Sequence, residues 1–443
     1  MTAPYRTQSF SVALAPLHVL VIGGGIGGLC LAQGLKRAGI SVAVYERDRT
    51  LTDRLQGYRV HINPAGSSAL HACLPPDLFA VFDRTCGRAT RAMHFLDEQM
   101  RVLLTIDGDM VEQQDKVAKH RSVSRITLRQ VLLSGLDDVV HLGKTFTRYE
   151  EVASGRIVAH FEDGTSAEGD VLVAADGGGS RVRRQFLPQA ERVDTGVVGI
   201  AGKVFLDGAG RGRIAPLLLD GMALIAAKGG LGLFVALQEF AGEAGGGIGG
   251  NDAQFDGGAL FDNSRSYLMW ALSGRRDKLG LDGEQFDGAA LSATAARAMA
   301  SWAPGLLNLV RMSDPDTISC IPIRTSRPVA PWPTARVTLI GDAIHAMTPY
   351  RGIGANIALK DAVRLRDALV TAQSGDEPLL DAIGGYEAAM RDYGFKAVRN
   401  SLQAMQQTTG QGPIAMALSR AAFRLIDKLP PLKRMMAKGM GND

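Results

Sequence analysis

The sequence predicts an α/β fold, in which a Rossmann-like nucleotide-binding domain is interrupted by a mainly β domain and followed by C-terminal helices. Three observations support this prediction. An apolar run at residues 19–22 ends in glycines at positions 23, 25 and 28, and a helix-compatible segment follows. A second apolar run, residues 42–45, leads directly to Glu46. Residues 193–325 contain strand-like runs without alternating helices.

The glycine spacing is typical of a βαβ unit that binds a dinucleotide. Gly23 allows a tight turn, Gly25 has no side chain to keep a pyrophosphate from the backbone, and Gly28 lets helix and strand pack closely. The helix N-terminus offers free N–H groups and a positive dipole end to the phosphates. Glu46 lies where a carboxylate accepts hydrogen bonds from ribose hydroxyls. The motif alone leaves open whether the ligand is FAD or NAD(P).

Composition limits the other classes of function. At 443 residues the chain exceeds the size of one core, and its net charge of +4 with no basic stripe gives no case for nucleic acid. The four cysteines include no CxxC pair and the eight histidines lack metal-ligand spacing, so we predict neither disulfides nor a metal site. No apolar run reaches the length of a membrane span. We expect a soluble, cytoplasmic monomer or homodimer without an integral membrane segment.

The chain is divided into three predicted parts. The nucleotide-binding domain comprises residues 1–87, 115–192 and 326–395, and the β domain comprises residues 88–114 and 193–325. Residues 396–443 form a helical tail, and a glycine-rich stretch at 242–258 is expected to be a surface loop. Two interpretations of the basic, Met-rich end stay open. We favour a helix packed on the body; the alternative is contact with a membrane surface through Lys428, Lys433, Arg434 and Lys438.

A second motif follows the wholly apolar run at residues 171–175. Asp176-Gly177 would lie at the carboxyl edge of the sheet, where open α/β sheets bind ligands, and Ser180 can cap the next helix. A plain Asx-type turn is the alternative. Upstream, Thr127 and Gln130 have the spacing of a capping box at the start of another helix.

A third motif follows the apolar run at residues 335–340. Gly341-Asp342 would end this strand, and Asp342 can accept hydrogen bonds from ligand hydroxyls. The loop at 351–354 can approach a flat ring, and the helix that begins at Ala355 and Asn356 favours negative charge, as on a reduced flavin. We expect His345 to pack or to hydrogen-bond within its turn, rather than to transfer protons.

Together these residues resemble the single-component, FAD-dependent monooxygenases of the para-hydroxybenzoate hydroxylase fold, which include aromatic and polyketide hydroxylases. The resemblance spans residues 17–395 and rests on three motifs in order: Gly23–Gly28 with Glu46; Asp176-Gly177-x-x-Ser180-x-Val182-Arg183; and Gly341-Asp342-Ala343-x-His345 with Pro349, Gly352, Gly354, Asn356 and Asp361. One departure is Ile353, where the family often has Gln between the last two glycines.

The resemblance implies which residues contact FAD. The ADP half would lie on the first motif, Arg129 matches the family's FAD-contacting arginine, and Asp342 would bind the ribityl and pyrophosphate region. The full predicted set of cofactor-binding residues is Gly23, Gly25, Ile26, Gly27, Gly28, Glu46, Arg47, Arg129, Asp176, Gly177, Gly341, Asp342, Pro349, Gly352, Gly354, Ala355 and Asn356. Arg59 and His61 follow the first βαβ unit and are candidate catalytic residues.

The resemblance also implies a reaction. NAD(P)H would reduce the flavin, O₂ would form a C4a-hydroperoxide, and one oxygen atom would pass to an aromatic or polyketide-like small molecule. The alternatives are a flavin oxidoreductase or a non-catalytic FAD-binding protein of the same fold. A flavin-dependent halogenase is disfavoured because Trp302 and Trp332 lack the Trp-x-Trp-x-Ile-Pro signature. For Met222, Phe234 and Trp270 on the β layer, we favour core packing over substrate contact.

Overall fold

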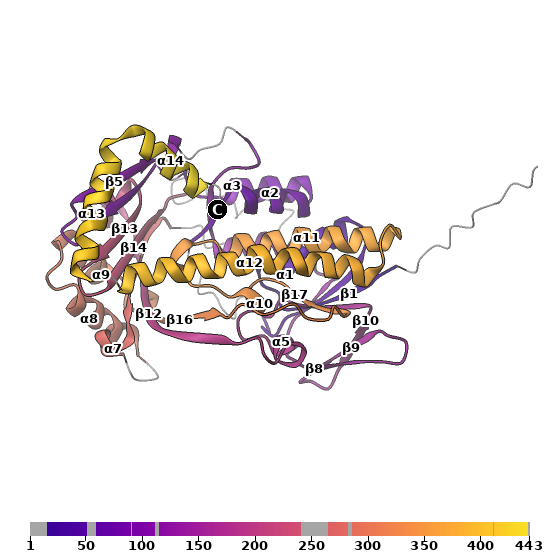
Figure 1. Ribbon diagram of the computed structural model, residues 1–443. Coiled ribbons are helices and arrows are strands. Elements are labelled where there is room, and N and C mark those ends of the chain that lie inside the picture. Colours follow the sequence, from indigo (N-terminus) through magenta and orange to yellow (C-terminus); the bar gives the residue numbers. More distant parts are fainter. Residues whose placement is uncertain are drawn as a thin grey trace, which may run out of the picture.

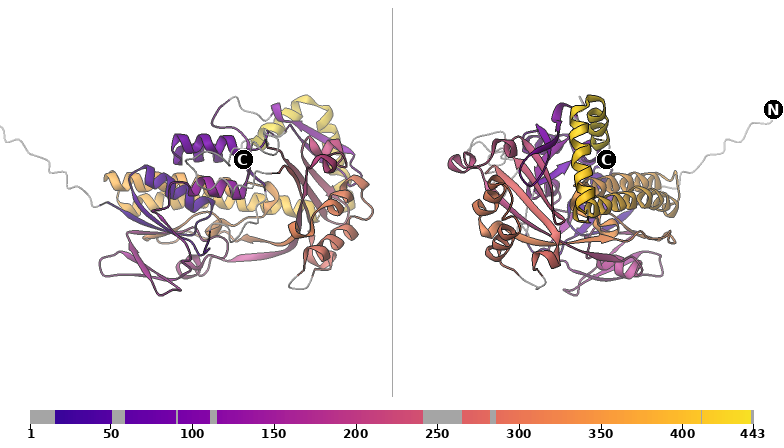
Figure 2. Two further views of the ribbon diagram at one scale, coloured as in Figure 1. Left: turned by 180° about the vertical axis from the view of Figure 1, so that it is seen from behind. Right: turned by 60° about the vertical axis from the view of Figure 1, so that its left-hand side comes forward.

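The computed structural model describes residues 16–50, 59–89, 91–110, 115–240, 265–281, 286–410 and 412–441. It has two main parts, which lie side by side in Figure 1 and, from behind, in Figure 2. Each part is built around one large sheet, and the predicted α/β fold class is confirmed. The predicted glycine-rich loop at residues 242–258 lies outside the described residues.

The first sheet is parallel, in the order β17-β11-β1-β2-β7. Its central strands are buried along most of their length, because helices pack on one face and the small sheet of β8, β9 and β10 packs on the other. The strands are β1 (His18–Ile22), β2 (Ser41–Tyr45), β7 (Val140–His141), β11 (Val171–Ala174) and β17 (Val337–Leu339).

Helices and two small sheets surround this parallel sheet. The long α11 and α12 run side by side in Figure 1. The helices are α1 (Ile26–Arg37), α2 (Pro64–Cys73), α3 (Pro76–Thr85), α4 (Arg125–Leu133), α5 (Arg181–Phe186), α10 (Asp342–His345), α11 (Gly354–Ser374) and α12 (Leu379–Gly410), with the short helix η5 (Pro349–Arg351). The small sheets join β3 (Arg59–Ile62) to β6 (Arg121–Ser124), and β8 (Phe146–Glu151), β9 (Ile157–Phe161) and β10 (Ser166–Gly169) to one another.

The second large sheet has seven strands in the order β16-β12-β15-β14-β13-β4-β5, antiparallel except between β13 and β4. They are β4 (Ala92–Leu96), β5 (Val102–Asp107), β12 (Arg192–Phe205), β13 (Gly221–Ala227), β14 (Leu231–Gln238), β15 (Tyr267–Arg275) and β16 (Ser319–Ser326). The accompanying short elements are η1 (Gly108–Met110), α6 (Gly208–Arg211), η2 (Pro216–Leu219), α7 (Arg276–Leu279), α8 (Gly288–Ala298), α9 (Pro304–Met312) and η4 (Pro315–Thr317).

Alternation along the strands gives this second sheet two different faces. One face packs against α8 and α9 in an apolar cluster that contains Trp270, whose indole N–H donates to Ser313 Oγ at 2.7 Å. The other face carries a smaller cluster of Tyr267, Met269 and Ala236, against which Met222 and Phe234 pack half-buried. Core packing is therefore the role of Trp270, whereas Met222 and Phe234 lie half-buried on the face opposite α8 and α9.

Two sequence predictions about helices need correction or a new boundary. Helix α4 begins at Arg125 with Ser124 as its N-cap, so Thr127 lies buried inside the helix and the capping-box prediction is wrong. Helix α12 continues through residue 396, so the predicted start of the C-terminal tail falls within one unbroken helix. Two further helices, α13 (Pro413–Lys428) and α14 (Pro430–Gly441), complete the chain.

Candidate functional site

The three sequence motifs meet at one edge of the parallel sheet. Strands β17, β11 and β1 are neighbours, and each is followed by one of the motifs. Because all three strands run in the same direction, the turns that follow them lie at the same carboxyl edge, where doubly wound sheets bind ligands. Residues that are more than 300 positions apart in sequence thereby form one candidate site.

In the turn after β1, close packing requires glycine at two positions, and a third glycine borders open space. Gly23 has φ +110°, and a Cβ there would lie 2.4 Å from the carbonyl oxygen of Ala175. A Cβ on Gly28 would lie 2.2 Å from the Gly23 carbonyl oxygen. A Cβ on Gly25 would meet nothing within 4 Å, although this residue is the N-cap of α1. Space beside a helix N-terminus is what a pyrophosphate requires.

Glu46 and Arg129 hold the same turn from two sides. The Gly24 N–H donates to Glu46 Oε2 at 2.6 Å, and Arg129 Nε donates to the Gly24 carbonyl oxygen at 3.0 Å. Glu46 Oε1 also accepts from the Asp48 N–H at 3.0 Å. Ile26 and Gly27 begin α1, where a Cβ on Gly27 would lie 3.2 Å from Ala358, and Arg47 is exposed next to Glu46.

The second motif is tied to the third by an arginine. Ser180 Oγ accepts from the Arg183 N–H at 2.9 Å, as expected for an N-cap, and Gly177 has φ +75°. Arg183 Nη1 donates to the carbonyl oxygen of Ala343 at 2.7 Å, which joins α5 to α10. Asp176 Oδ2 accepts from the Arg181 N–H at 2.8 Å, while its buried Oδ1 accepts from no described group. Burial raises the pKa of Asp176, against the lowering effect of the hydrogen bonds it accepts.

A buried carboxylate organises the third motif. Asp361 Oδ2 accepts from the Gly341 N–H and from His345 Nε2, both at 2.7 Å, and Oδ1 accepts from the Tyr393 hydroxyl at 2.6 Å. Burial alone would lower the pKa of His345, but the charge and hydrogen bond of Asp361 outweigh it, and the pKa is raised. His345 therefore hydrogen-bonds to α11 beneath its turn, while Asp342 is exposed at the strand end.

The start of α11 is connected to β3 by the side chain of Asn356. Its Oδ1 accepts from the Asn63 N–H, and its Nδ2 donates to the His61 carbonyl oxygen, both at 2.9 Å. The Asn356 side chain is 2% exposed, so a cofactor would meet the backbone at this position. Before Asn356, Pro349 begins the short helix η5, Gly352 follows it with φ +63°, and Gly354 and Ala355 are the first two residues of α11. A Cβ on Gly352 would meet nothing within 4 Å.

Arg59 and His61 point from one face of β3 toward the second sheet. Arg59 Nη1 lies 3.4 Å from Met222 Sδ on β13, and burial lowers the pKa of its guanidinium to about 10, with Tyr267 acting in the opposite direction. His61 Nε2 lies 3.0 Å from Nδ1 of His120, and the two rings stack. Burial, together with Arg59 and His120, lowers the pKa of His61 to about 3.

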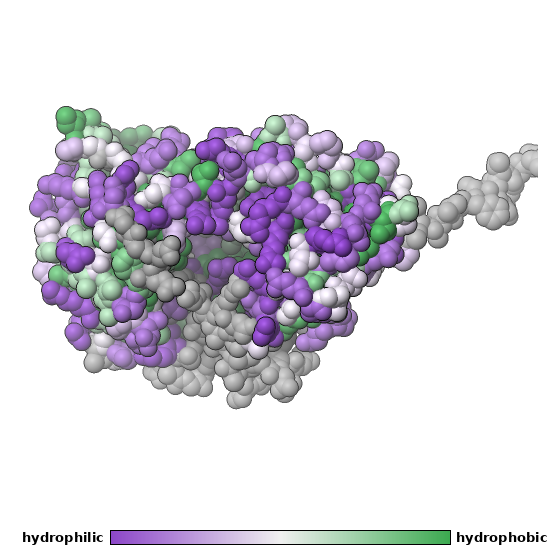
Figure 3. All heavy atoms as spheres, turned by 90° about the horizontal axis from the view of Figure 1, so that it is seen from below, coloured by the Kyte–Doolittle hydropathy of each residue, from purple (hydrophilic) through white to green (hydrophobic). Residues whose placement is uncertain are grey.

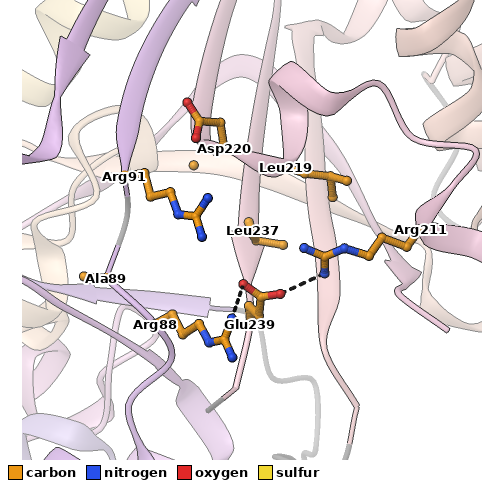
Figure 4. Close-up of a pocket in the computed structure, with 9 residues that line it drawn as sticks. Arg88, Ala89, Arg91, Arg211, Leu219, Asp220, Leu237 and Glu239 are labelled. Carbon is orange, nitrogen blue, oxygen red and sulfur yellow. Dashed lines mark hydrogen bonds and ion pairs between the residues drawn. The ribbon is translucent and has the colours of Figure 1, made fainter. Parts of the chain in front are cut away.

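A separate pocket lies at the end of the second sheet (Figure 4). Arg88, Arg91 and Arg211 line it, with Glu239 within 2.8 Å of Arg211 and 3.5 Å of Arg88. Leu237 alternates with Ala236 along β14 and packs against the cluster that includes α8 and α9, so this pocket borders that face of the sheet. The space-filling view in Figure 3 shows a hollow near the middle of the face seen from below.

Several residues of the site have roles that the motifs did not reveal. The motifs do not include Tyr393, Asn63 or His120, and they assign no contact to Arg183 or Asp361. No local signal identifies these contacts, except that Asp361 follows the glycine loop at a fixed distance on the first turns of α11. Within the described ranges, no group of three or more His, Cys, Asp or Glu could hold a metal ion, and no helix could cross a bilayer.

Asp361→Asn is expected to destabilise the protein by ~3–5 kcal/mol, because an amide cannot accept from all three donors and leaves buried groups unpaired. Tyr393→Phe removes one donor only and should cost ~1–2 kcal/mol. Urea denaturation of both variants without cofactor measures the difference. Equal losses for the two variants would show that Asp361 does not organise the turn.

His61 is expected to make stability fall with pH below about 6.5. The folded state keeps the ring neutral down to about pH 3, whereas the unfolded chain takes up a proton near its ordinary pKa, so acid favours unfolding in this window. The free energy of unfolding, measured between pH 7 and pH 5, should therefore decrease less steeply in His61→Gln than in the wild type. If the free energy of unfolding fell equally with pH in both proteins, His61 would not be neutral in the folded state.

Two family models match the chain. One described as an FAD binding domain covers residues 310–401, and one described as an NAD(P)-binding Rossmann-like domain covers residues 21–97. These two segments contain the third and the first motif, respectively.

Similar curated proteins include FAD-dependent monooxygenases. The chain is 30% identical over 402 residues to the dual O-methyltransferase/FAD-dependent monooxygenase of Phaeosphaeria nodorum, covering 85% of this chain and 43% of that protein. It thus spans less than half of the first such relatives. It is also 30% identical over 384 residues to the FAD-dependent urate hydroxylase of Klebsiella pneumoniae, covering 85% of this chain and 86% of that protein.

Solved structures share the fold along almost the whole chain. A Photorhabdus luminescens protein described as an FAD-containing monooxygenase is 36% identical, with a TM-score of 0.78 over 89% of this chain and 98% of that one. A variant of Klebsiella pneumoniae HpxO complexed with FAD is 25% identical, with a TM-score of 0.76 over 96% and 99%. From its motifs, its fold and these likenesses, the chain belongs to the family of FAD-dependent monooxygenases.

Proposed function

We propose that this chain is a monooxygenase that uses NAD(P)H and O₂ to insert one oxygen atom into an aromatic or polyketide-like small molecule. The observation that carries the proposal is the meeting of three motifs at one sheet edge, with open space over Gly25. The two alternative functions are a flavin oxidoreductase and a non-catalytic FAD-binding protein. Turnover experiments distinguish both of them from a monooxygenase.

The residues at this edge fit FAD. Gly25 leaves room for the pyrophosphate, and Glu46 offers carboxylate oxygens for the ribose on the other side of the Gly24 turn. The buried Oδ1 of Asp176 and the exposed carboxylate of Asp342 are acceptors available to ligand hydroxyls. Gly352 and the N-terminus of α11 would take the flavin end. When bound, FAD would supply the two-electron redox chemistry and the activation of O₂.

The substrate would lie between β3 and the face of the second sheet that is opposite α8 and α9. Met222 and Phe234 supply half-buried apolar surface there, and Arg59 supplies a half-buried positive charge. A half-buried cation stabilises an ionised phenol or enol, which is the more electron-rich form of the substrate. His61, with a pKa of about 3, is too weak a base to remove that proton near neutral pH, so its role is to position neighbouring groups.

Gly25→Ala and Gly28→Ala form a matched pair that tests the cofactor cradle. Gly25 has open space and an extended backbone, so its variant should keep its thermal stability without cofactor but bind FAD at least ~tenfold more weakly. Gly28→Ala should instead lose ~1–3 kcal/mol of stability or fail to fold, because its Cβ meets the Gly23 carbonyl. Unchanged FAD affinity in a folded Gly25→Ala protein, measured by fluorescence titration, would contradict the placement.

The monooxygenase proposal is tested by turnover of the FAD-loaded protein. We expect NAD(P)H and O₂ consumption to rise on addition of a phenolic acceptor, with hydroxylated product that contains ¹⁸O from ¹⁸O₂. Arg59→Met should lower kcat/KM for an acidic phenol by ~10–100-fold, whereas Arg91→Met in the separate pocket should not. Oxidation of NAD(P)H without oxygen transfer would favour a reductase, and no oxidation with any acceptor would favour a binding protein.

A further inference from the structure

Helix α13 has two apolar faces, and only one of them is covered by protein. Met416 is buried, and Phe423 packs on Phe95 of β4 with ring centroids 4.9 Å apart, on the side that faces the second sheet. Figures 1 and 2 place α13 and α14 along the outer edge of that sheet. A helix that is apolar on its outer face as well requires a second apolar surface.

The outer face is a stripe with helical spacing. Ile414, Leu418 and Leu425 are 79%, 67% and 57% exposed, and their spacing, with exposed Ala421 between, puts them on one side of the helix. Leu429, Leu432 and Met435 continue the exposed apolar residues into α14. We call these residues, 414 to 435, the outer stripe. Six of the eleven large exposed hydrophobic residues in the described part of the chain belong to it.

The same two helices carry an excess of positive charge. Residues 412–441 contain six Lys and Arg against one Asp, a net charge of +5. Because the whole chain has a net charge of +4, the remaining residues together carry about one negative charge. Arg420 and Lys433 are used in ion pairs with Glu98 and with Asp427 and Asp107. Arg424, Lys428 and Arg434 are exposed beside the outer stripe, and the ion pairs of the described residues do not include them.

We propose that the outer stripe of α13 and α14 binds the surface of an anionic lipid bilayer, with its leucines in the interface and its exposed cations on the headgroups. Apolar side chains flanked by Lys and Arg are the arrangement that holds an amphipathic helix in the plane of a membrane. A second copy of this chain would cover the same apolar surface, but it would bring five further positive charges against the first five. An anionic lipid surface covers the outer stripe and also neutralises the positive charge of the two helices.

Vesicle binding by the full-length protein tests this assignment and requires no turnover. We expect cosedimentation with phosphatidylcholine vesicles that contain phosphatidylglycerol, weaker binding to pure phosphatidylcholine, and loss of the difference in high salt. Leu418→Glu with Leu425→Glu should weaken binding at least ~tenfold. Arg424→Gln with Lys428→Gln should reduce mainly the part that depends on phosphatidylglycerol. Leu380→Glu, on an exposed leucine at the start of α12, is the control and should bind as the wild type does.

Three results would overturn the assignment. The wild type could fail to bind anionic vesicles, or the Leu418→Glu, Leu425→Glu protein could bind them as tightly as the wild type. Light scattering could also show a dimer that these two substitutions dissociate, with no vesicle binding, which would identify a second copy as the occupant. FAD content and thermal denaturation of each variant establish that it is folded, so a failure of the proposed oxygenation would not be mistaken for a failure here.

Discussion

The carboxylate of Asp361 is the contact on which the candidate site depends most. It accepts hydrogen bonds from three other segments: the turn after β17, the short helix α10, and α12. A fully buried carboxylate is stable only when its oxygens accept hydrogen bonds. Separating any of these segments from Asp361 would therefore destabilise the folded protein by several kcal/mol. The left-handed Gly341 turn is fixed in this way, and with it the exposed position of Asp342.

The two ends of the site are held by different means. At the turn after β1, backbone sterics fix the geometry. A side chain at Gly23 or Gly28 would collide with neighbouring backbone atoms, so only glycine allows the close contacts. At the end of β17, hydrogen bonds of polar side chains on α11 and α12 fix the geometry. These side chains are Asp361, Tyr393 and Asn356. Asn356 also links this end to β3, so the position of Arg59 and His61 depends on the same helix that would receive the flavin.

Local constraints explain why much of the site could be predicted from sequence. Strand, glycine turn and helix are adjacent in the chain, and the roles of Gly23, Gly25 and Gly28 follow from backbone geometry alone. The meeting of the three motifs follows from parallel strand order, which the family resemblance supplied. The partners of Asp361, Asn356 and His61 could not be predicted, because each depends on packing between elements far apart in sequence. The capping-box prediction was wrong for a similar reason. Thr127 is buried within α4, and the local sequence pattern does not determine where that helix begins.

The most direct measurement of the central claim is an FAD titration of the wild type and of Asp342→Ala, followed by flavin fluorescence. Asp342 is exposed and borders the strand end, so its replacement should leave the folded protein intact. The account predicts one FAD per chain in the wild type and an affinity at least ~tenfold weaker in the variant. Equal affinity in the two proteins, or no FAD binding by the wild type, would contradict the assignment of the three strand ends as the flavin site.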